Sequence, residues 1–193
     1  FCGPTDPSVG LTDLVGFNRY DGWYVNAIED FAPGLDALRA KRPELKLAIS
    51  EYGAGASPAL HAAAPKKMDH TEEYQLAFLE AYWQALASRR FVWGSFVWDM
   101  FDFASDGRKE GDHPGRNDKG LVTYDRKTKK DGFYCLKASW SSAPFVHVTG
   151  ARFSPRPKGP TDVKVYSNAE TVRLRVEGAP LAEQTARGHV FVW

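Results

Sequence analysis

The chain has 193 residues, of which 43% are hydrophobic and 25% are charged, a profile typical of a soluble globular protein. Its 25 basic residues nearly balance its 24 acidic residues, so the charge gives no case for binding nucleic acid or an anionic membrane. No apolar run approaches the roughly 20 residues of a transmembrane helix, and the two cysteines, Cys2 and Cys135, leave one disulfide or two free thiols equally open.

The first 140 residues alternate between apolar runs and helical patterns. Strands are predicted at 14–17, 47–50 and 91–98, and helices at 28–38, 71–90 and 131–140. Each predicted strand is apolar throughout, and the run FVWGSFVW at 91–98 leaves no polar face for solvent. This pattern predicts an α/β fold with a parallel sheet that is covered on both sides.

Residues 99–130 interrupt the alternation with a long loop, and its aromatic residues and lack of repeats favour a functional segment over disorder. After Pro144 the chain changes to short segments with apolar residues at every second position, as at Val163 and Val165. About four such segments predict a truncated immunoglobulin-like β-sandwich. We therefore expect one domain at 1–144 and part of a second at 145–193.

Polar and aromatic residues stand where the predicted strands end. These positions are Asn18-Arg19-Tyr20, Glu51-Tyr52-Gly53 and Trp98-Asp99. The carboxyl ends of parallel strands converge on one face of the fold, where active sites lie. A carboxylate with a tyrosine and a tryptophan predicts a sugar-processing site, in which Gly53 and Gly55 would let the backbone approach a ligand closely. An ion pair of Glu51 with Arg19 stays open as the alternative.

Other site motifs are weaker. The segment GAGAS lacks the third glycine of a dinucleotide-binding loop, no GxSxG nucleophile elbow is present, and the five histidines have no metal-ligand spacing. Four acidic residues of the long loop offer oxygen ligands for a hard cation: Asp102, Asp106, Glu110 and Asp112. Their spacing matches no defined loop and favours a solvated acidic segment, so no metal site is assigned.

Four blocks of the sequence, taken together, resemble the C-terminal part of the catalytic barrel of bacterial β-galactosidases in glycoside hydrolase family 2. They are FNRYDGWY, ISEYGAG, FVWGSFVWDMFDF and GRNDKGLVTYDRKTKKDGFYCLKASW. The resemblance covers residues 13–144 almost continuously, and TDVKVYSNAETVRLRVEG resembles the start of the β-sandwich that follows the barrel in many of these enzymes. It implies the C-terminal part of a (β/α)8 TIM barrel, here about the sixth to eighth strands.

The resemblance also implies roles for single residues. The Glu of the SEYG block is the catalytic nucleophile in the family, which places that role on Glu51, and Tyr20 of the NRYxGW block would orient it. Trp98 would form the floor of the sugar pocket, and Asn117 with Lys119 matches a pair that meets the sugar carboxylate in glucuronidases. The substrate-binding set that we expect is Asn18, Trp23, Trp98, Asp99, Asn117 and Lys119.

Two departures from the family pattern limit these implications. The family's acid/base glutamate belongs to an Asn-Glu pair, and no such pair occurs in this sequence. The best-known galactosidases carry a histidine three residues after the nucleophile, where this chain has Ala54. The chain also begins without an initiator Met or a signal-peptide pattern, so we expect a piece of a longer protein.

The sequence therefore predicts a retaining exo-β-glycosidase of family 2 that hydrolyses terminal β-D-galactose residues, with a β-galactoside as its partner. Two alternatives stay open: a β-glucuronidase that uses Lys119 against a uronate, and a catalytically incomplete carbohydrate-binding fragment. No cofactor is required, and a divalent cation stays open. The resemblance favours a periplasmic or secreted location slightly over the cytoplasm, without deciding it.

Overall fold

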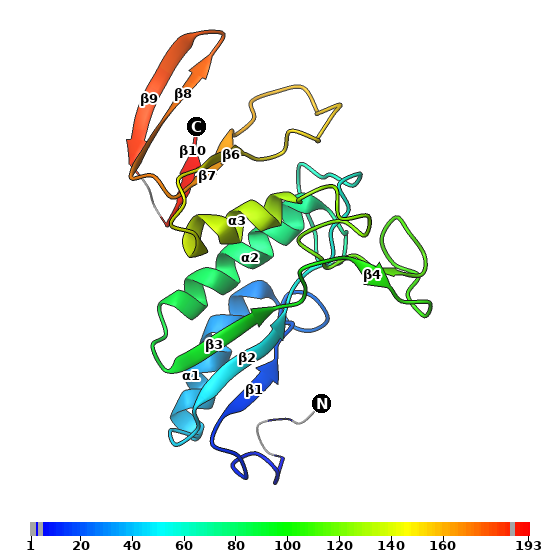
Figure 1. Ribbon diagram of the computed structural model, residues 1–193, viewed down its shortest axis with the longest axis vertical. Coiled ribbons are helices and arrows are strands. Elements are labelled where there is room, and N and C mark those ends of the chain that lie inside the picture. Colours follow the sequence, from blue (N-terminus) through cyan, green and yellow to red (C-terminus); the bar gives the residue numbers. More distant parts are fainter. Residues whose placement is uncertain (1–2, 4–5, 186–187) are drawn as a thin grey trace.

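The computed structural model describes residues 3, 6–185 and 188–193. Parallel strands form its central sheet in the order β1-β2-β3 (Figure 1), namely β1 (Val15–Asn18), β2 (Leu47–Tyr52) and β3 (Val92–Val97). The short helix η1 (Ile28–Asp30) and helix α1 (Phe31–Lys41) connect β1 to β2, and α2 (Glu72–Ala87) connects β2 to β3. The predicted alternation of parallel strands and helices is confirmed, although the described strands do not close a barrel.

Helix α2 is fixed at its first turn by side-chain capping and along its length by aromatic packing. The hydroxyl oxygen of Thr71 accepts a hydrogen bond from the Tyr74 backbone N–H at 3.1 Å, as a threonine N-cap does. Tyr82 stacks on Phe31 of α1 at 3.7 Å and on Phe78 at 4.1 Å between ring centroids. This aromatic core attaches both helices to the sheet and holds the strand ends in place.

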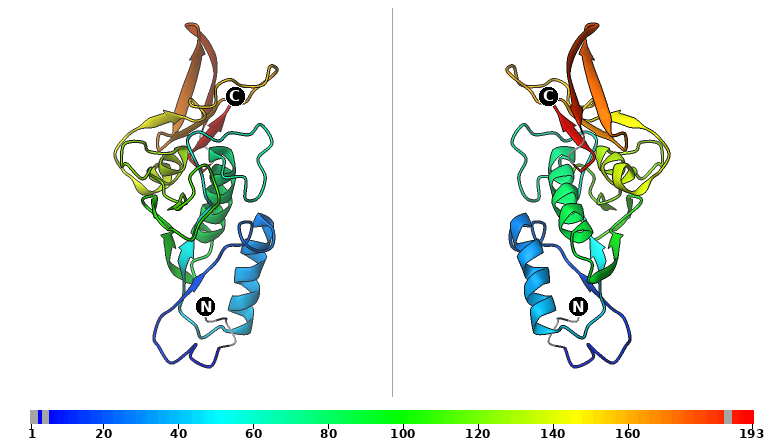
Figure 2. Two further views of the ribbon diagram at one scale, coloured as in Figure 1. Left: turned by 90° about the vertical axis from the view of Figure 1, so that its right-hand side faces the viewer. Right: turned by 90° about the vertical axis from the view of Figure 1, so that its left-hand side faces the viewer.

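The sheet is covered on one face only. Helices α1 and α2 both lie on the same side of β1–β3 (Figure 2). On β3 the rings of Trp93 and Phe96 lie 6.3 Å apart between centroids, and they remain 49% and 54% exposed. The prediction that both faces are covered and that residues 91–98 have no solvent face is therefore wrong for the described residues. In a closed (β/α)8 barrel the open face would line the interior, which other side chains fill.

The long segment after β3 folds back over the carboxyl ends of the strands. It contains the two-stranded antiparallel ribbon of β4 (Phe103–Ala104) and β5 (Arg116–Asn117). Helix α3 (Asp131–Trp140) follows, with the bounds that the sequence predicts, and packs along α2 (Figure 1). Cys135 on α3 is buried and free, whereas Cys2 lies outside the described residues.

The C-terminal residues form two separate antiparallel ladders. One is a sheet in the order β10-β7-β6, from β6 (Val146–Val148), β7 (Lys164–Ser167) and β10 (Val190–Val192), and the other pairs β8 (Thr171–Val176) with β9 (Ala179–Thr185). Strand β9 has the sequence APLAEQT, which lacks apolar alternation and was not predicted. The expected immunoglobulin-like sandwich is not shown by these strands, and the boundary at 144/145 stays a prediction.

The C-terminal part is tied to the barrel-like part by ion pairs. Arg152 bonds Glu72 at the start of α2 with N···O distances of 2.6 and 2.8 Å, and Lys164 of β7 bonds Glu80 at 2.8 Å. Because Glu72 is 1% exposed, this contact is largely shielded from screening by salt. None of the helices in the described ranges is long and apolar enough to cross a membrane.

Candidate active site

The ends of the three parallel strands lie side by side. Asn18 at the end of β1 is in register with Glu51 of β2, and the Arg19 backbone N–H donates to the Glu51 carbonyl at 2.8 Å. The Trp98 backbone N–H donates to the Tyr52 carbonyl at 2.8 Å. The topology thus places the three predicted groups of residues at one edge of the sheet, as expected for parallel strands.

Glu51 is held by Tyr20. The Tyr20 hydroxyl donates to Glu51 Oε2 at 3.0 Å. Burial, reinforced by the charge of Glu51, holds the pKa of Tyr20 far above its usual range, so this hydroxyl stays protonated and remains a donor. Arg19 forms its ion pair with Asp21 at 2.8 Å. The alternative in which Arg19 pairs with the Glu51 carboxylate is therefore not found.

Aromatic rings connect this pair to Lys119. The Tyr20 and Tyr24 rings lie 5.0 Å apart between centroids. The Lys119 ammonium stands 4.9 Å from the Tyr24 centroid and 5.3 Å from that of Trp23. Lys119 is 1% exposed, and its Nζ has no hydrogen-bond partner among the residues that the structure describes. A buried ammonium without a hydrogen bond is costly unless a ligand supplies an acceptor.

Three of the other predicted binding residues make contacts within the protein. Trp23 is fully buried, and its ring packs on that of His70 at 5.0 Å between centroids. Its face contacts the Lys119 ammonium and is not accessible to solvent. Asn117 is 2% exposed, and its side-chain oxygen accepts a hydrogen bond from the Lys119 backbone N–H at 3.1 Å. Asn18 accepts a hydrogen bond from the Ser50 hydroxyl at 2.7 Å. Their substrate contacts remain predictions.

The two glycines after Glu51 serve packing between loops. A Cβ at Gly53 would lie 2.0 Å from the Trp98 carbonyl oxygen, and a Cβ at Gly55 would lie 2.5 Å from Asp118 Oδ1. Both positions therefore exclude any larger residue. The close approach that we expected toward a ligand is made here to other parts of the chain.

Trp98 lies at the end of β3. Its ring packs edge to face on the ring of Phe103, at 5.8 Å between centroids, and the peptide bond between Trp98 and Asp99 is cis.

The position of Asp99 predicts a pH-dependent stability. Burial, reinforced by the charge of Asp102, raises the pKa of the Asp99 carboxyl from 3.8 to about 7. Its Oδ1 is buried and has no hydrogen-bond partner in the described ranges. A carboxyl with a raised folded-state pKa binds its proton more tightly when folded. Its stabilising contribution is thus complete below the unfolded-state pKa of about 3.9 and is lost as the pH rises through the folded-state value.

We therefore expect Asp99→Asn to remove a pH dependence. Asn imitates the protonated carboxyl, so the melting temperatures of wild type and variant should agree near pH 4 and diverge toward pH 8, with the variant more stable, because only wild type then carries the buried charge. Melting curves of the whole protein between these pH values measure this. Two curves that stay parallel over the range would show that Asp99 does not titrate there.

A buried lysine that the sequence did not single out joins the loops around the site. Lys130 is 0% exposed, and its Nζ donates to Ala56 O at 2.6 Å, Asp102 Oδ1 at 2.7 Å and Asp118 O at 2.8 Å. These acceptors belong to the loop after β2, the loop after β3 and the Asn117–Lys119 turn. In the sequence Lys130 closes the basic run RKTKK, which is typical of a solvated surface, so no local signal revealed it.

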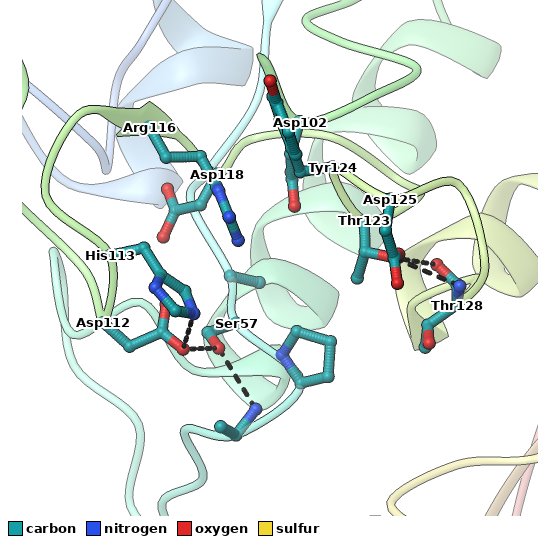
Figure 3. Close-up of a pocket in the computed structure, with 13 residues that line it drawn as sticks. Ser57, Asp102, Asp112, His113, Arg116, Asp118, Thr123, Tyr124, Asp125 and Thr128 are labelled. Atoms are coloured by element: carbon teal, nitrogen blue, oxygen red, sulfur yellow. Dashed lines mark hydrogen bonds and ion pairs between the residues drawn. The ribbon is translucent and has the colours of Figure 1, made fainter. Parts of the chain in front are cut away.

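Three of the four acidic residues that the sequence offered as cation ligands each bond a different partner, and the fourth, Asp106, is exposed. Asp102 pairs with Lys130, Glu110 with Arg108, and Asp112 Oδ2 accepts a hydrogen bond from Ser57 at 2.6 Å. A neighbouring cavity of about 410 Å³ is lined by residues that include Asp112, His113, Arg116 and Asp118 (Figure 3), but not by Glu51. Within the described ranges no three potential metal ligands converge.

Comparison with known proteins points to one enzyme family. Residues 8–143 match the model of the TIM barrel domain of glycosyl hydrolases family 2. A β-glucuronidase of Bacteroides fragilis is 41% identical over 190 residues, which are 95% of this chain and 27% of that protein. The chain thus spans about a quarter of the length of the curated relatives that it matches.

Solved structures of glycosidases share the fold of this chain. The FMN-binding β-glucuronidase from Faecalibacterium prausnitzii L2-6 superposes with a TM-score of 0.95 at 43% identity, over 99% of this chain and 30% of that one. A candidate β-galactosidase from Bacteroides fragilis superposes with a TM-score of 0.87 at 34% identity, over 94% of this chain and 28% of that one. The fold similarity therefore extends through the C-terminal ladders.

Proposed function

The chain belongs to glycosyl hydrolase family 2, and from this premise we propose that it carries the nucleophile and the uronate-binding lysine of a retaining β-glucuronidase. The sequence favoured β-galactosidase first and β-glucuronidase as the alternative. The relatives at 41% and 43% identity, both β-glucuronidases, support the alternative better. The activity is proposed for the whole protein, of which this chain is a part.

In the proposed reaction, Glu51 attacks the anomeric carbon of the sugar and forms a covalent glycosyl-enzyme. A second carboxyl group, absent from this chain, protonates the leaving oxygen and then deprotonates the water that releases the sugar. Tyr20 donates a hydrogen bond to Glu51, which orients the nucleophile. Retention requires the two carboxyl groups at about 5–5.5 Å from each other.

The buried Lys119 ammonium is the observation that carries the choice of a uronic acid. Within the described part of the chain its Nζ has no hydrogen-bond partner, and the nearest carboxylate oxygen, on Glu110, is 4.0 Å away. A substrate carboxylate would supply a charge-assisted hydrogen bond to this group. The 6-hydroxymethyl group of galactose offers only a neutral acceptor, which brings no negative charge to the ammonium.

Replacing Lys119 by Met tests this assignment. We expect kcat/KM of the whole protein for nitrophenyl β-glucuronide to fall about 10²-fold or more, because a site built for a charged partner loses that partner. Turnover of nitrophenyl β-galactoside should stay at its wild-type level, however small that is. Lys109→Met, at an exposed position, is the matched control and should leave both rates unchanged.

The alternatives have distinct results in the same assay. Faster turnover of the galactoside than of the glucuronide by wild type would favour the β-galactosidase hypothesis. Turnover of neither glycoside by the whole protein would support a carbohydrate-binding role without catalysis. An equal loss for both glycosides in Lys119→Met would mean that Lys119 maintains the fold and does not select the substrate.

A further inference from the structure

A second ion pair covers Lys119. Glu110 Oε1 lies 4.0 Å from Lys119 Nζ, too far for a hydrogen bond, and Arg108 binds the same carboxylate oxygen. Arg108 Nη1 also donates to the Tyr24 hydroxyl at 3.0 Å. The side chains of Arg108 and Glu110 are 29% and 25% exposed, whereas that of Lys119 is 1% exposed. A ligand that approaches Lys119 along this side therefore meets the Arg108–Glu110 pair first.

The backbone that carries this pair is anchored. The loop between β4 and β5 is closed by hydrogen bonds from Ser105 N to Gly115 O at 2.8 Å and from Gly115 N to Arg108 O at 2.7 Å. Asp112 of the same loop bonds Ser57. Gly111, in the left-handed region at φ 73°, lies so close to Asp118 that a Cβ would come within 2.5 Å of its carboxylate. The backbone of this loop is thus held in place, whereas the partly exposed side chain of Glu110 is free to rotate.

The charges of the pair fit a carboxylate ligand. Arg108 and Lys119 are cations and Glu110 is an anion, so the cluster as a whole attracts one further anion. A substrate carboxylate and the Glu110 carboxylate repel each other if both stand beside Lys119. Since Glu110 is partly exposed, it can turn into water at low cost when a stronger partner arrives.

We propose that Glu110 occupies the place of the substrate carboxylate beside Lys119, and that a uronic acid exchanges with it, with Arg108 as a second cation for the incoming carboxylate. This inference rests on the proposed β-glucuronidase function and deepens it. A neutral sugar has no group that can displace Glu110, and it leaves the Arg108–Glu110 pair closed. The pair would thus act in substrate selection together with Lys119.

Steady-state kinetics of Glu110→Gln in the whole protein test the exchange. Loss of the competing charge should lower KM for nitrophenyl β-glucuronide by about 3- to 10-fold, the size of one charge at short range in partly hydrated surroundings. The value of kcat should stay within about twofold, because the proposed exchange takes place at the sugar carboxylate and not at the anomeric carbon. KM for nitrophenyl β-galactoside should not change.

Two further variants complete the test. Arg108→Gln should raise KM for the glucuronide by about the same factor as Glu110→Gln lowers it, since one attractive charge is lost. Asp106→Asn changes the charge at an exposed site of the same loop and should have no effect. An unchanged KM in Glu110→Gln, or an equal change for both glycosides, overturns the exchange. If the exchange is overturned but wild type cleaves the glucuronide in a Lys119-dependent manner, the proposed β-glucuronidase function is retained without the exchange. If wild type does not cleave the glucuronide, both the function and the exchange are rejected.

Discussion

Replacing Glu51 by Gln is expected to lower turnover of nitrophenyl β-glucuronide by the whole protein about 10⁴-fold or more, as the loss of a covalent nucleophile does in other enzymes. The amide keeps the shape of the side chain and its contact with Tyr20, but it cannot attack the anomeric carbon. The melting temperature should change little, because Glu51 forms no ion pair in the described structure.

Chemical rescue separates a nucleophile from a residue that only supports the site. In Glu51→Ala, azide should enter the space of the lost carboxylate, attack the anomeric carbon and expel the leaving group, which gives an α-glycosyl azide. Glu44→Gln, at an exposed carboxylate paired with Arg42, serves as the control and should keep full activity. Appreciable turnover by Glu51→Gln without azide would remove Glu51 from the nucleophile role.

Replacing Lys130 by Met is expected to destabilise the whole protein by about 3–5 kcal/mol, because it leaves the buried carboxylate of Asp102 without its counter-ion. Lys130 Nζ also satisfies two buried carbonyl groups, those of Ala56 and Asp118. Their loss of a donor adds to the effect. Denaturant unfolding monitored by tryptophan fluorescence measures the change in the free energy of unfolding.

A double variant identifies the cause of this loss. Lys130→Met with Asp102→Asn removes both charges and should recover part of the stability, but not all, because the two carbonyl groups stay unpaired. Lys127→Met, at an exposed position three residues earlier, should change the free energy of unfolding by less than about 0.5 kcal/mol. If Lys130→Met behaved like Lys127→Met, the buried lysine would not hold the loops together.

The three parallel strands and the three α-helices of the first 140 residues could be predicted because their patterns are local, whereas the short ribbon of β4 and β5 was not predicted. The apolar runs gave the three parallel strands, and DGFYCLKASW gave α3 with the observed bounds. The solvent exposure of Trp93 and Phe96 could not be predicted, since it depends on which parts of the fold cover the sheet. Strand β9 was missed because APLAEQT has neither alternation nor β-branched residues before its last position.

The site was predictable where the strand ends carry it. Glu51 and Tyr20 were placed together by the parallel topology and by the family resemblance, and the structure shows their hydrogen bond; their catalytic roles stay predictions. The position of Lys130 depends on long-range contacts with Ala56 and Asp102, and the role proposed for Glu110 depends on how its loop folds against Lys119. A sequence pattern encodes neither. Both are charged residues in polar segments, where exposure to water is the ordinary expectation.

Labelling of the whole protein with a 2-deoxy-2-fluoro-β-glucuronide that carries a good leaving group tests the central claim most directly. The fluorine slows release of the covalent glycosyl-enzyme, so the labelled peptide can be identified by mass spectrometry. We predict a single fluoroglucuronyl adduct on Glu51, in the peptide that contains SEYGAG, and much slower labelling by the matching fluorogalactoside. An adduct on another residue, or faster labelling of Glu51 by the fluorogalactoside, would contradict the assignment of Glu51 as the nucleophile of a β-glucuronidase.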